Sequence, residues 1–124
     1  MDISANFKSD LPEQIIPLDG ETTVTFKPIT PRRFEEINKK HTREKFKRGQ
    51  AITKTNWDRV IDDILDETVI GWTGLEADGG PIEVTRENKR KLYDYYNTFR
   101  AAFTDVVMGS LGDERDFTEQ LEGN

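Results

Sequence analysis

Four carboxylates at helical spacing are the first residues of this chain that could support chemistry. They form the run Asp62-Asp63-x-x-Asp66-Glu67, in which residues four apart share one face of a helix. Paired carboxylates can hold a hard cation such as Mg²⁺. The same pattern is typical of the solvated side of an amphipathic helix, and no second carboxylate cluster with a matching apolar pocket is evident. We therefore favour the solvated face and expect no metal.

Residues suited to catalysis are scarce. The only histidine, His41, lies in the charged stretch KKHTREK, where the sequence offers neither an orienting acid nor a nucleophile. The chain has no cysteine, which excludes disulfides and thiolate metal ligands. Glycine-rich phosphate-binding motifs and nucleophile motifs are missing as well. We expect no enzymatic activity and no cofactor.

Charge is divided unevenly along a chain whose net charge is −6. Between Lys27 and Arg59 there are eleven Lys and Arg against four Asp and Glu, whereas Val60 to Thr85 holds seven acids and no Lys or Arg. Such segregation indicates either a basic ligand surface or complementary pairing, within one chain or between subunits. The negative total disfavours nucleic-acid binding, and the role of the basic Lys27–Arg59 segment stays open.

Two extended runs near the N-terminus predict a β hairpin over about residues 14–28. Asp19-Gly20 separates QIIPL from TTVTFKP, and Asp-Gly between such runs is a strong hairpin signal. Alternation places Val24 and Phe26 on one face. Because two strands alone are marginal in water, we expect the hairpin to pack on a helix or to pair with another chain.

Helical periodicity accounts for most of the remaining chain. The pattern predicts a helix over residues 31–47, a loop over 48–54 and a clear amphipathic helix over 57–70. Residues 85–111 predict either one long helix or two helices broken near Asn97.

An apolar connector joins the last two helical patterns, and it contains Trp72, Leu75 and Ile82 around the turn 78–81. We expect it to fold back and pack under the helix ends. The predicted fold class is therefore mainly α with a small N-terminal β hairpin (α+β), with three to four helices packed around this structured connector.

The predicted organisation is a single helical domain, residues 13–112, that includes the hairpin. A disordered N-terminus over residues 1–12 precedes it, and an acidic, mobile tail over residues 113–124 follows. The N-terminus does not resemble a signal peptide, and no apolar run approaches the length of a membrane span.

Residues 69–88 read VIGWTGLEADGGPIEVTREN. This order is similar to the "W-x-G-L … G-x-P-x-x-x-T-x-E-N" segment of small tail assembly chaperones from long-tailed bacteriophages and prophages. In layout, the resemblance extends over residues 14–112. The connector positions that carry it are Trp72, Gly74, Leu75, Gly79, Pro81, Ile82, Thr85 and Asn88.

The resemblance implies a function in phage assembly. Proteins of this family bind the aggregation-prone tape measure protein and keep it soluble while the tail is assembled. It also implies self-association into a homo-oligomer and, as a further partner, a frameshifted longer form of the same protein. The expected location is the host bacterial cytoplasm, without membrane contact and without incorporation into the mature virion.

A chaperone of this kind would cover apolar helical segments of its client with its own amphipathic helices. The candidate contact residues are apolar or aromatic side chains that the core does not obviously require. They are Phe34, Ile37, Phe46, Tyr93 and Tyr95.

Two other functions stay open from the sequence. The chain could be a structural phage component, either a head–tail connector or a tail terminator subunit, which would be present in purified particles. It could also be a small nucleic-acid-binding regulator that uses the Lys27–Arg59 segment, for which salt-sensitive binding is expected.

Overall fold

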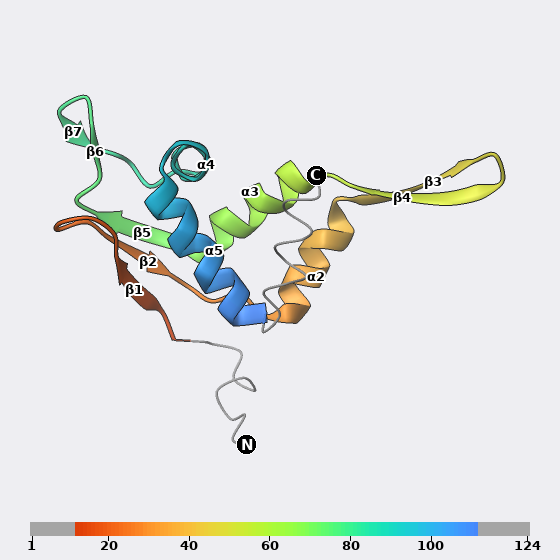
Figure 1. The fold of residues 1–124 in the computed structure, drawn as a ribbon, viewed down its shortest axis with the longest axis horizontal. Coiled ribbons are helices and arrows are strands. Elements are labelled where there is room, and N and C mark those ends of the chain that lie inside the picture. The colour runs from red at the N-terminus through yellow and green to blue at the C-terminus, as the bar shows by residue number, and fades with distance from the viewer. Residues whose placement is uncertain (1–11, 112–124) are drawn as a thin grey trace, which may run out of the picture.

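The computed structural model describes residues 12–111 (Figure 1). The predictions for the two chain ends, residues 1–12 and 113–124, fall almost entirely outside this range. The described elements, in chain order, are β1 (Gln14–Pro17), β2 (Thr23–Phe26), α2 (Pro31–Lys40), β3 (Thr42–Lys47), β4 (Gln50–Thr55), α3 (Trp57–Thr68), β5 (Val69–Thr73), β6 (Glu76–Ala77), β7 (Gly80–Pro81), α4 (Arg86–Tyr95) and α5 (Asn97–Leu111).

The prediction of a mainly α fold with a small N-terminal hairpin is wrong. The described residues form an α+β fold with about 47% helix and 29% strand, and its strands belong to three small sheets. Two of the expected irregular segments are strands, and one expected helix ends early. The physical reasons differ between the sheets.

The first sheet has three strands in the order β1-β2-β5, so the N-terminal strands are not a simple hairpin. The Asp19-Gly20 turn does join β1 to β2, and the backbone of Leu18 donates to the carbonyl of Thr22 at 2.9 Å. The third strand comes from the predicted connector and follows α3 without a break. Val24 consequently pairs with Ile16 on one side and with Trp72 on the other, so the sheet does not depend on another chain for a third strand.

The predicted helix over residues 31–47 ends at Lys40, and residues 42–55 form the antiparallel hairpin β3–β4. Arg48 and Gly49 have φ angles of 54° and 76°, and positive φ at both central residues is what a type I′ hairpin turn requires. Phe46 is the only large apolar residue between positions 41 and 47, so a longer helix would bury little. In the second strand, β-branched residues favour extended backbone.

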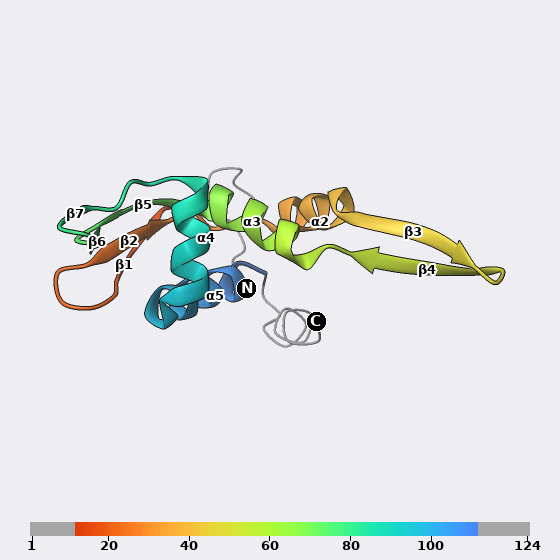
Figure 2. The same ribbon diagram turned by 90° about the horizontal axis from the view of Figure 1, so that it is seen from above.

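We call the β3–β4 hairpin the arm. Figures 1 and 2 show it projecting along the long axis of the molecule, away from the other elements. Its base is tied to the body, because the backbone of Asn56 donates to the carbonyl of His41 at 2.9 Å and the hydroxyls of Thr42 and Thr55 are 2.8 Å apart.

The core lies between the three-stranded sheet and the helices. Val24 and Phe26 are fully buried on the inner face of β2, and the Phe26 ring lies 6.4 Å from that of Phe99 in α5. Residues from α2, α3 and α4 complete this cluster. Its buried members are Val24, Phe26, Ile29, Ile37, Val60, Ile61, Ile64, Leu65, Val69, Leu75, Leu92, Tyr93, Phe99, Phe103, Val106 and Val107.

The connector packs on this core. The Trp72 indole nitrogen donates to the carbonyl of Ile82 at 2.8 Å, and the Trp72 ring lies edge-on to Phe99 at 6.3 Å. Leu75 is only 9% exposed. These contacts join the strand after α3 to the segment before α4.

We predict that Gly74→Ala destabilises the fold through this connector. Gly74 has a φ of 81°, and a Cβ there would lie 3.1 Å from the Thr22 Cα and 3.2 Å from the Glu21 carbonyl oxygen. We expect a loss of about 2 kcal/mol or more, measured by urea unfolding, because the left-handed backbone alone costs an L-residue about 1–2 kcal/mol.

Gly79→Ala is the matched control, because Gly79 also has a φ of 81° but has open space where its Cβ would lie. The Gly79→Ala variant therefore has the unfavourable backbone conformation but no close contact at its Cβ. Equal destabilisation by the two variants would show that the approach of the connector to the β1–β2 turn does not constrain the fold.

Candidate protein-binding surface

The acidic face of α3, which we define as Asp58 and the run Asp62–Glu67, is partly exposed to solvent and is also paired with cations. Its carboxylates form ion pairs with cations of α4: Arg90 with Asp58 and Asp62 at 3.1 and 3.2 Å, and Lys89 with Asp66 at 3.2 Å. Across residues 12–111, no group of three or more acidic or histidine side chains is placed to hold a metal ion. These carboxylates are structural.

Asp63 is the centre of this network. One carboxylate oxygen accepts from Arg86 of α4 at 2.5 Å, and the other lies 2.6 Å from Nε2 of His41 and 3.7 Å from the ammonium of Lys40. Burial by itself would raise the pKa of Asp63, but the hydrogen bonds from Arg86 and His41 outweigh it and lower the pKa from 3.8 to about 2. His41 is therefore engaged in linking α2 to α3.

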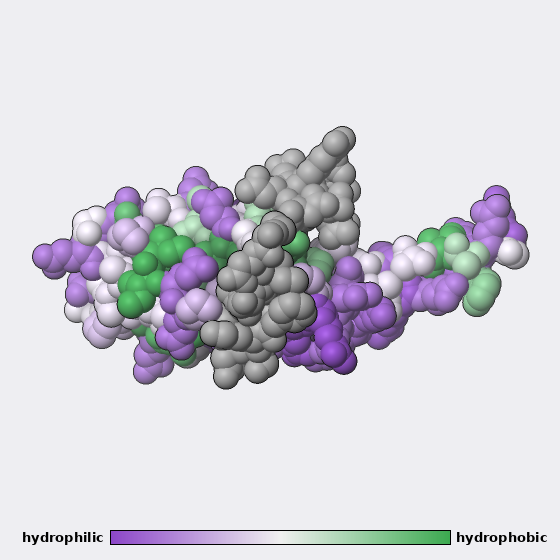
Figure 3. Space-filling model, turned by 90° about the horizontal axis from the view of Figure 1, so that it is seen from below, coloured by the Kyte–Doolittle hydropathy of each residue, from purple (hydrophilic) through white to green (hydrophobic). Residues whose placement is uncertain are grey.

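The arm differs from the body because its side chains are exposed. Phe46 is 78% exposed and Ile52 is 46% exposed, and Figure 3 shows hydrophobic surface on the arm next to hydrophilic side chains. Both residues lie in the half of the hairpin next to the turn. A two-stranded hairpin has no core of its own, so binding to a partner would bury these side chains.

The pairing register gives the arm two different faces, because residues opposite each other in the hairpin share a face. Phe46 pairs with Ala51, and Glu44 pairs with Thr53, on the face that we call the Phe46 face. The other face, which we call the basic face, carries most of the cations of the arm. Its members are Arg43, Lys45, Lys47, Gln50, Ile52 and Lys54.

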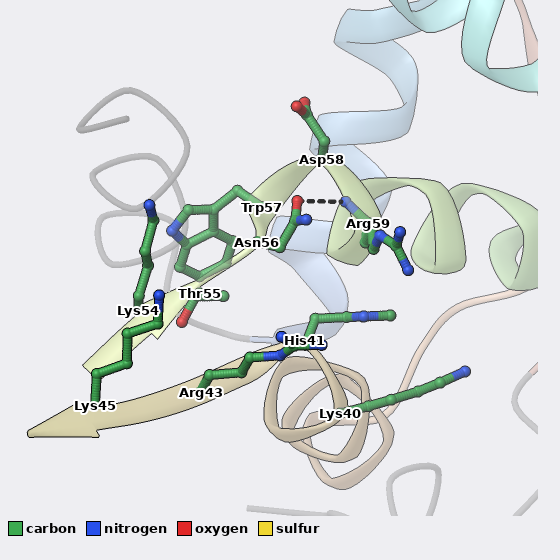
Figure 4. Close-up of a pocket in the computed structure, with 10 residues that line it drawn as sticks. All are labelled: Lys40, His41, Arg43, Lys45, Lys54, Thr55, Asn56, Trp57, Asp58 and Arg59. Carbon is green, nitrogen blue, oxygen red and sulfur yellow. Dashed lines mark hydrogen bonds between the residues drawn. The ribbon is translucent and has the colours of Figure 1, made fainter. Parts of the chain in front are cut away.

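The basic face borders an open hollow of about 840 Å³ where the arm meets the body. Figure 4 shows Lys45 and Lys54 rising from the arm on the same side as the ring of Trp57, which opens α3. Arg43 and Arg59 add two further cations to the lining. We call this site the basic hollow.

The five residues predicted to contact a partner lie in different environments. Phe46 and Tyr95 are 78% and 87% exposed. Ile37 and Tyr93 belong to the core at 1% and 2% exposure, and the Tyr93 ring lies edge-on to Phe103 of α5 at 5.6 Å. Phe34 is half-buried and packs against the core. Only Phe46 and Tyr95 are thus accessible for binding without rearrangement.

The connector residues are structural in the described fold. Gly79 supplies a positive φ in the turn between β6 and β7, and Pro81 lies in β7. The hydroxyl of Thr85 caps α4 by accepting from the backbone of Asn88 at 3.1 Å, and the Asn88 side chain donates to the carbonyl of Glu83 at 2.9 Å.

Sequence reasoning missed the basic hollow and Ile52. The available signal was the alternating segment AITKT after Arg48-Gly49, which favours a strand and a tight turn. Because the pattern of residues 31–47 predicts a helix, no strand was expected before this segment to pair with it. The contribution of Trp57 to the hollow depends on where the arm leaves the body, which no local pattern specifies.

The chain matches no protein-family model, and neither the curated proteins nor the solved structures searched gave a match. No helix in the described part of the chain has the length and apolar character to cross a bilayer.

We predict that Asp63→Asn destabilises the protein by about 2 kcal/mol at neutral pH, as expected for a pKa lowered from 3.8 to about 2. Because the pKa is lower in the folded chain, the carboxylate stabilises the fold fully above the unfolded value and loses this effect as the pH falls through about 2. Urea unfolding between pH 6 and pH 2 measures both effects.

Asp105→Asn is the control, because Asp105 is exposed and forms no ion pair within residues 12–111. Its stability should follow the wild-type pH dependence, whereas the Asp63 variant should lose less stability than the wild type on acidification. If the stability of the Asp63→Asn variant falls with decreasing pH as steeply as that of the wild type, Asp63 does not have the lowered pKa.

Proposed function

We propose that this protein is a phage tail assembly chaperone that binds the tape measure protein and keeps it soluble during tail assembly. The observation that carries the binding role is the arm, which exposes Phe46 and Ile52 away from the core. The proposed client rests on the resemblance of residues 69–88 to the chaperone family. We further propose action in the host cytoplasm, as a homo-oligomer and with a frameshifted longer form.

The binding mode that the arm supports differs from the helical one expected from the sequence. The Phe46 face has few charges, and its aromatic anchor is accompanied by small or β-branched residues. Burying an exposed aromatic side chain against an apolar client segment contributes about 1.5–3 kcal/mol. The charged body would keep the complex soluble.

Tyr95 supplies a second proposed contact at a distance from the arm. It ends α4, and it is the most exposed large hydrophobic residue in the described range at 87%. Two separated anchors suit a long client better than a small one, because each would engage a different segment and the combined binding would exceed either alone.

A second candidate function is nucleic-acid binding through the basic face. Across residues 12–111, Arg43, Lys45 and Lys54 form no ion pair, so their charges are available to phosphate. The net charge of −6 opposes this function. Fluorescence anisotropy with labelled DNA and RNA at low salt tests it, and binding that falls steeply with added salt would favour it over the chaperone.

We predict that Phe46→Thr weakens client binding about tenfold or more, since the aromatic anchor of the Phe46 face is removed while strand propensity is kept. The measurement is the soluble fraction of the tape measure protein from the same phage on co-expression, followed by the affinity of the purified pair. The stability of the variant itself should change by about 0.5 kcal/mol or less.

Ile15→Thr is the matched control, because it removes one exposed apolar side chain outside the arm. It should leave client solubility unchanged. A client that is equally insoluble with and without this protein contradicts the proposal. Purified phage particles separate it from the structural alternative, because a connector or terminator subunit would be present in them.

A further inference from the structure

The cations that the arm contributes to the basic hollow differ from those of α2 and α4. Arg43, Lys45 and Lys54 form no ion pair within residues 12–111. On α2 and α4, the Lys and Arg side chains are matched by acids, such as Arg33 with Glu67 at 2.7 Å. At the hollow, Arg43 lies directly opposite Lys54 in the hairpin, with Lys45 next on the same face. Like charges at opposed positions destabilise a hairpin, so an anionic group bound there would relieve repulsion.

No acid of the described residues neutralises the hollow. Asp58 is the only carboxylate that lines it, and Asp58 is paired with Arg90 at 3.1 Å. The hollow also presents the half-buried ring of Trp57. Its chemistry therefore suits an acidic peptide that carries an apolar residue.

The chain carries a segment of this composition immediately after α5. Residues 112–124 read GDERDFTEQLEGN, with five acids, one arginine and the apolar residues Phe117 and Leu121. The acids would face the basic side chains of the arm, and an apolar residue would face Trp57.

The segment is long enough to reach the hollow of its own chain. Figures 1 and 2 both place the end of α5 near the start of α2, and the hollow lies at the other end of α2, beside Lys40 and His41. A ten-residue helix is about 15 Å long, whereas the thirteen residues after Leu111 span up to about 40 Å. The segment is thus long enough to extend along α2 to the hollow, and attachment to the same chain raises its effective concentration to about the millimolar range.

We propose that residues 112–124 dock in the basic hollow of the same chain, with their carboxylates on Arg43, Lys45 and Lys54. This docking covers the basic face and leaves the Phe46 face open. It does not depend on the identity of the client, and it makes the hollow an intramolecular peptide-binding site.

The test places a nitroxide label on Thr118→Cys in the 124-residue chain, which has no other cysteine. Signals from the Trp57 indole and from the Arg43 and Lys54 amides of ¹⁵N-labelled protein should lose intensity about twofold or more at low salt. About 1 M salt should restore the intensity, because it shortens the screening length to about 3 Å.

Lys45→Glu with Lys54→Glu should abolish the broadening, and adding Glu114→Lys with Glu119→Lys should restore it through the reversed charge pair. Lys27→Glu is the control, because Lys27 is exposed and lies outside the hollow. It should leave the broadening unchanged.

Three results would overturn the proposal. The first is an absence of broadening in the wild-type background. The second is broadening that persists in the Lys45→Glu, Lys54→Glu variant. The third is broadening of a cysteine-free ¹⁵N chain by a separate spin-labelled chain, which would assign the segment to a second copy. All three measurements use this protein without any client. They can therefore support or contradict the docking even if the proposed chaperone function is wrong.

Discussion

Asp63 links three helices that a small apolar core would hold only loosely. Its carboxylate contacts the end of α2 through His41 and the start of α4 through Arg86, at 2.6 and 2.5 Å. Hydrophobic residues make up 34% of the chain and charged residues another 34%, so helix contacts must include charged faces. Removing one member of such a network leaves partly buried partners without their counterions, which is more costly than losing a surface pair.

This constraint extends into the sheet, because α3 continues directly into β5. The helix that carries Asp63 therefore fixes the third strand, and the backbone of Lys27 donates to the carbonyl of Thr68 at 2.7 Å where the two elements meet. Trp72 then packs from β5 onto Phe99 of α5. Charge pairs on one side of α3 and apolar packing on the other thus orient the whole body.

The arm begins where the packed helices and the three-stranded sheet end. Its base is fixed by the bond from Asn56 to His41, the residue that also contacts Asp63. Beyond the base, the arm is held together by the backbone hydrogen bonds between β3 and β4. Its two faces differ in chemistry, because one presents Phe46 and the other presents the cations of the hollow. The proposed apolar client and the proposed acidic peptide would therefore contact different faces of the arm.

The sequence alone determined the features that depend on local chemistry. Asp19-Gly20 specified a turn between two extended runs, and helical periodicity specified α3 as an amphipathic helix. Only the tertiary structure decided which strands pair, because the partner of β2 is distant in sequence, and which cations meet the acids of α3. It also decided that residues 42–55 form an arm, since a charged segment with one aromatic residue satisfies helix and strand patterns about equally until its turn and its base are fixed in space.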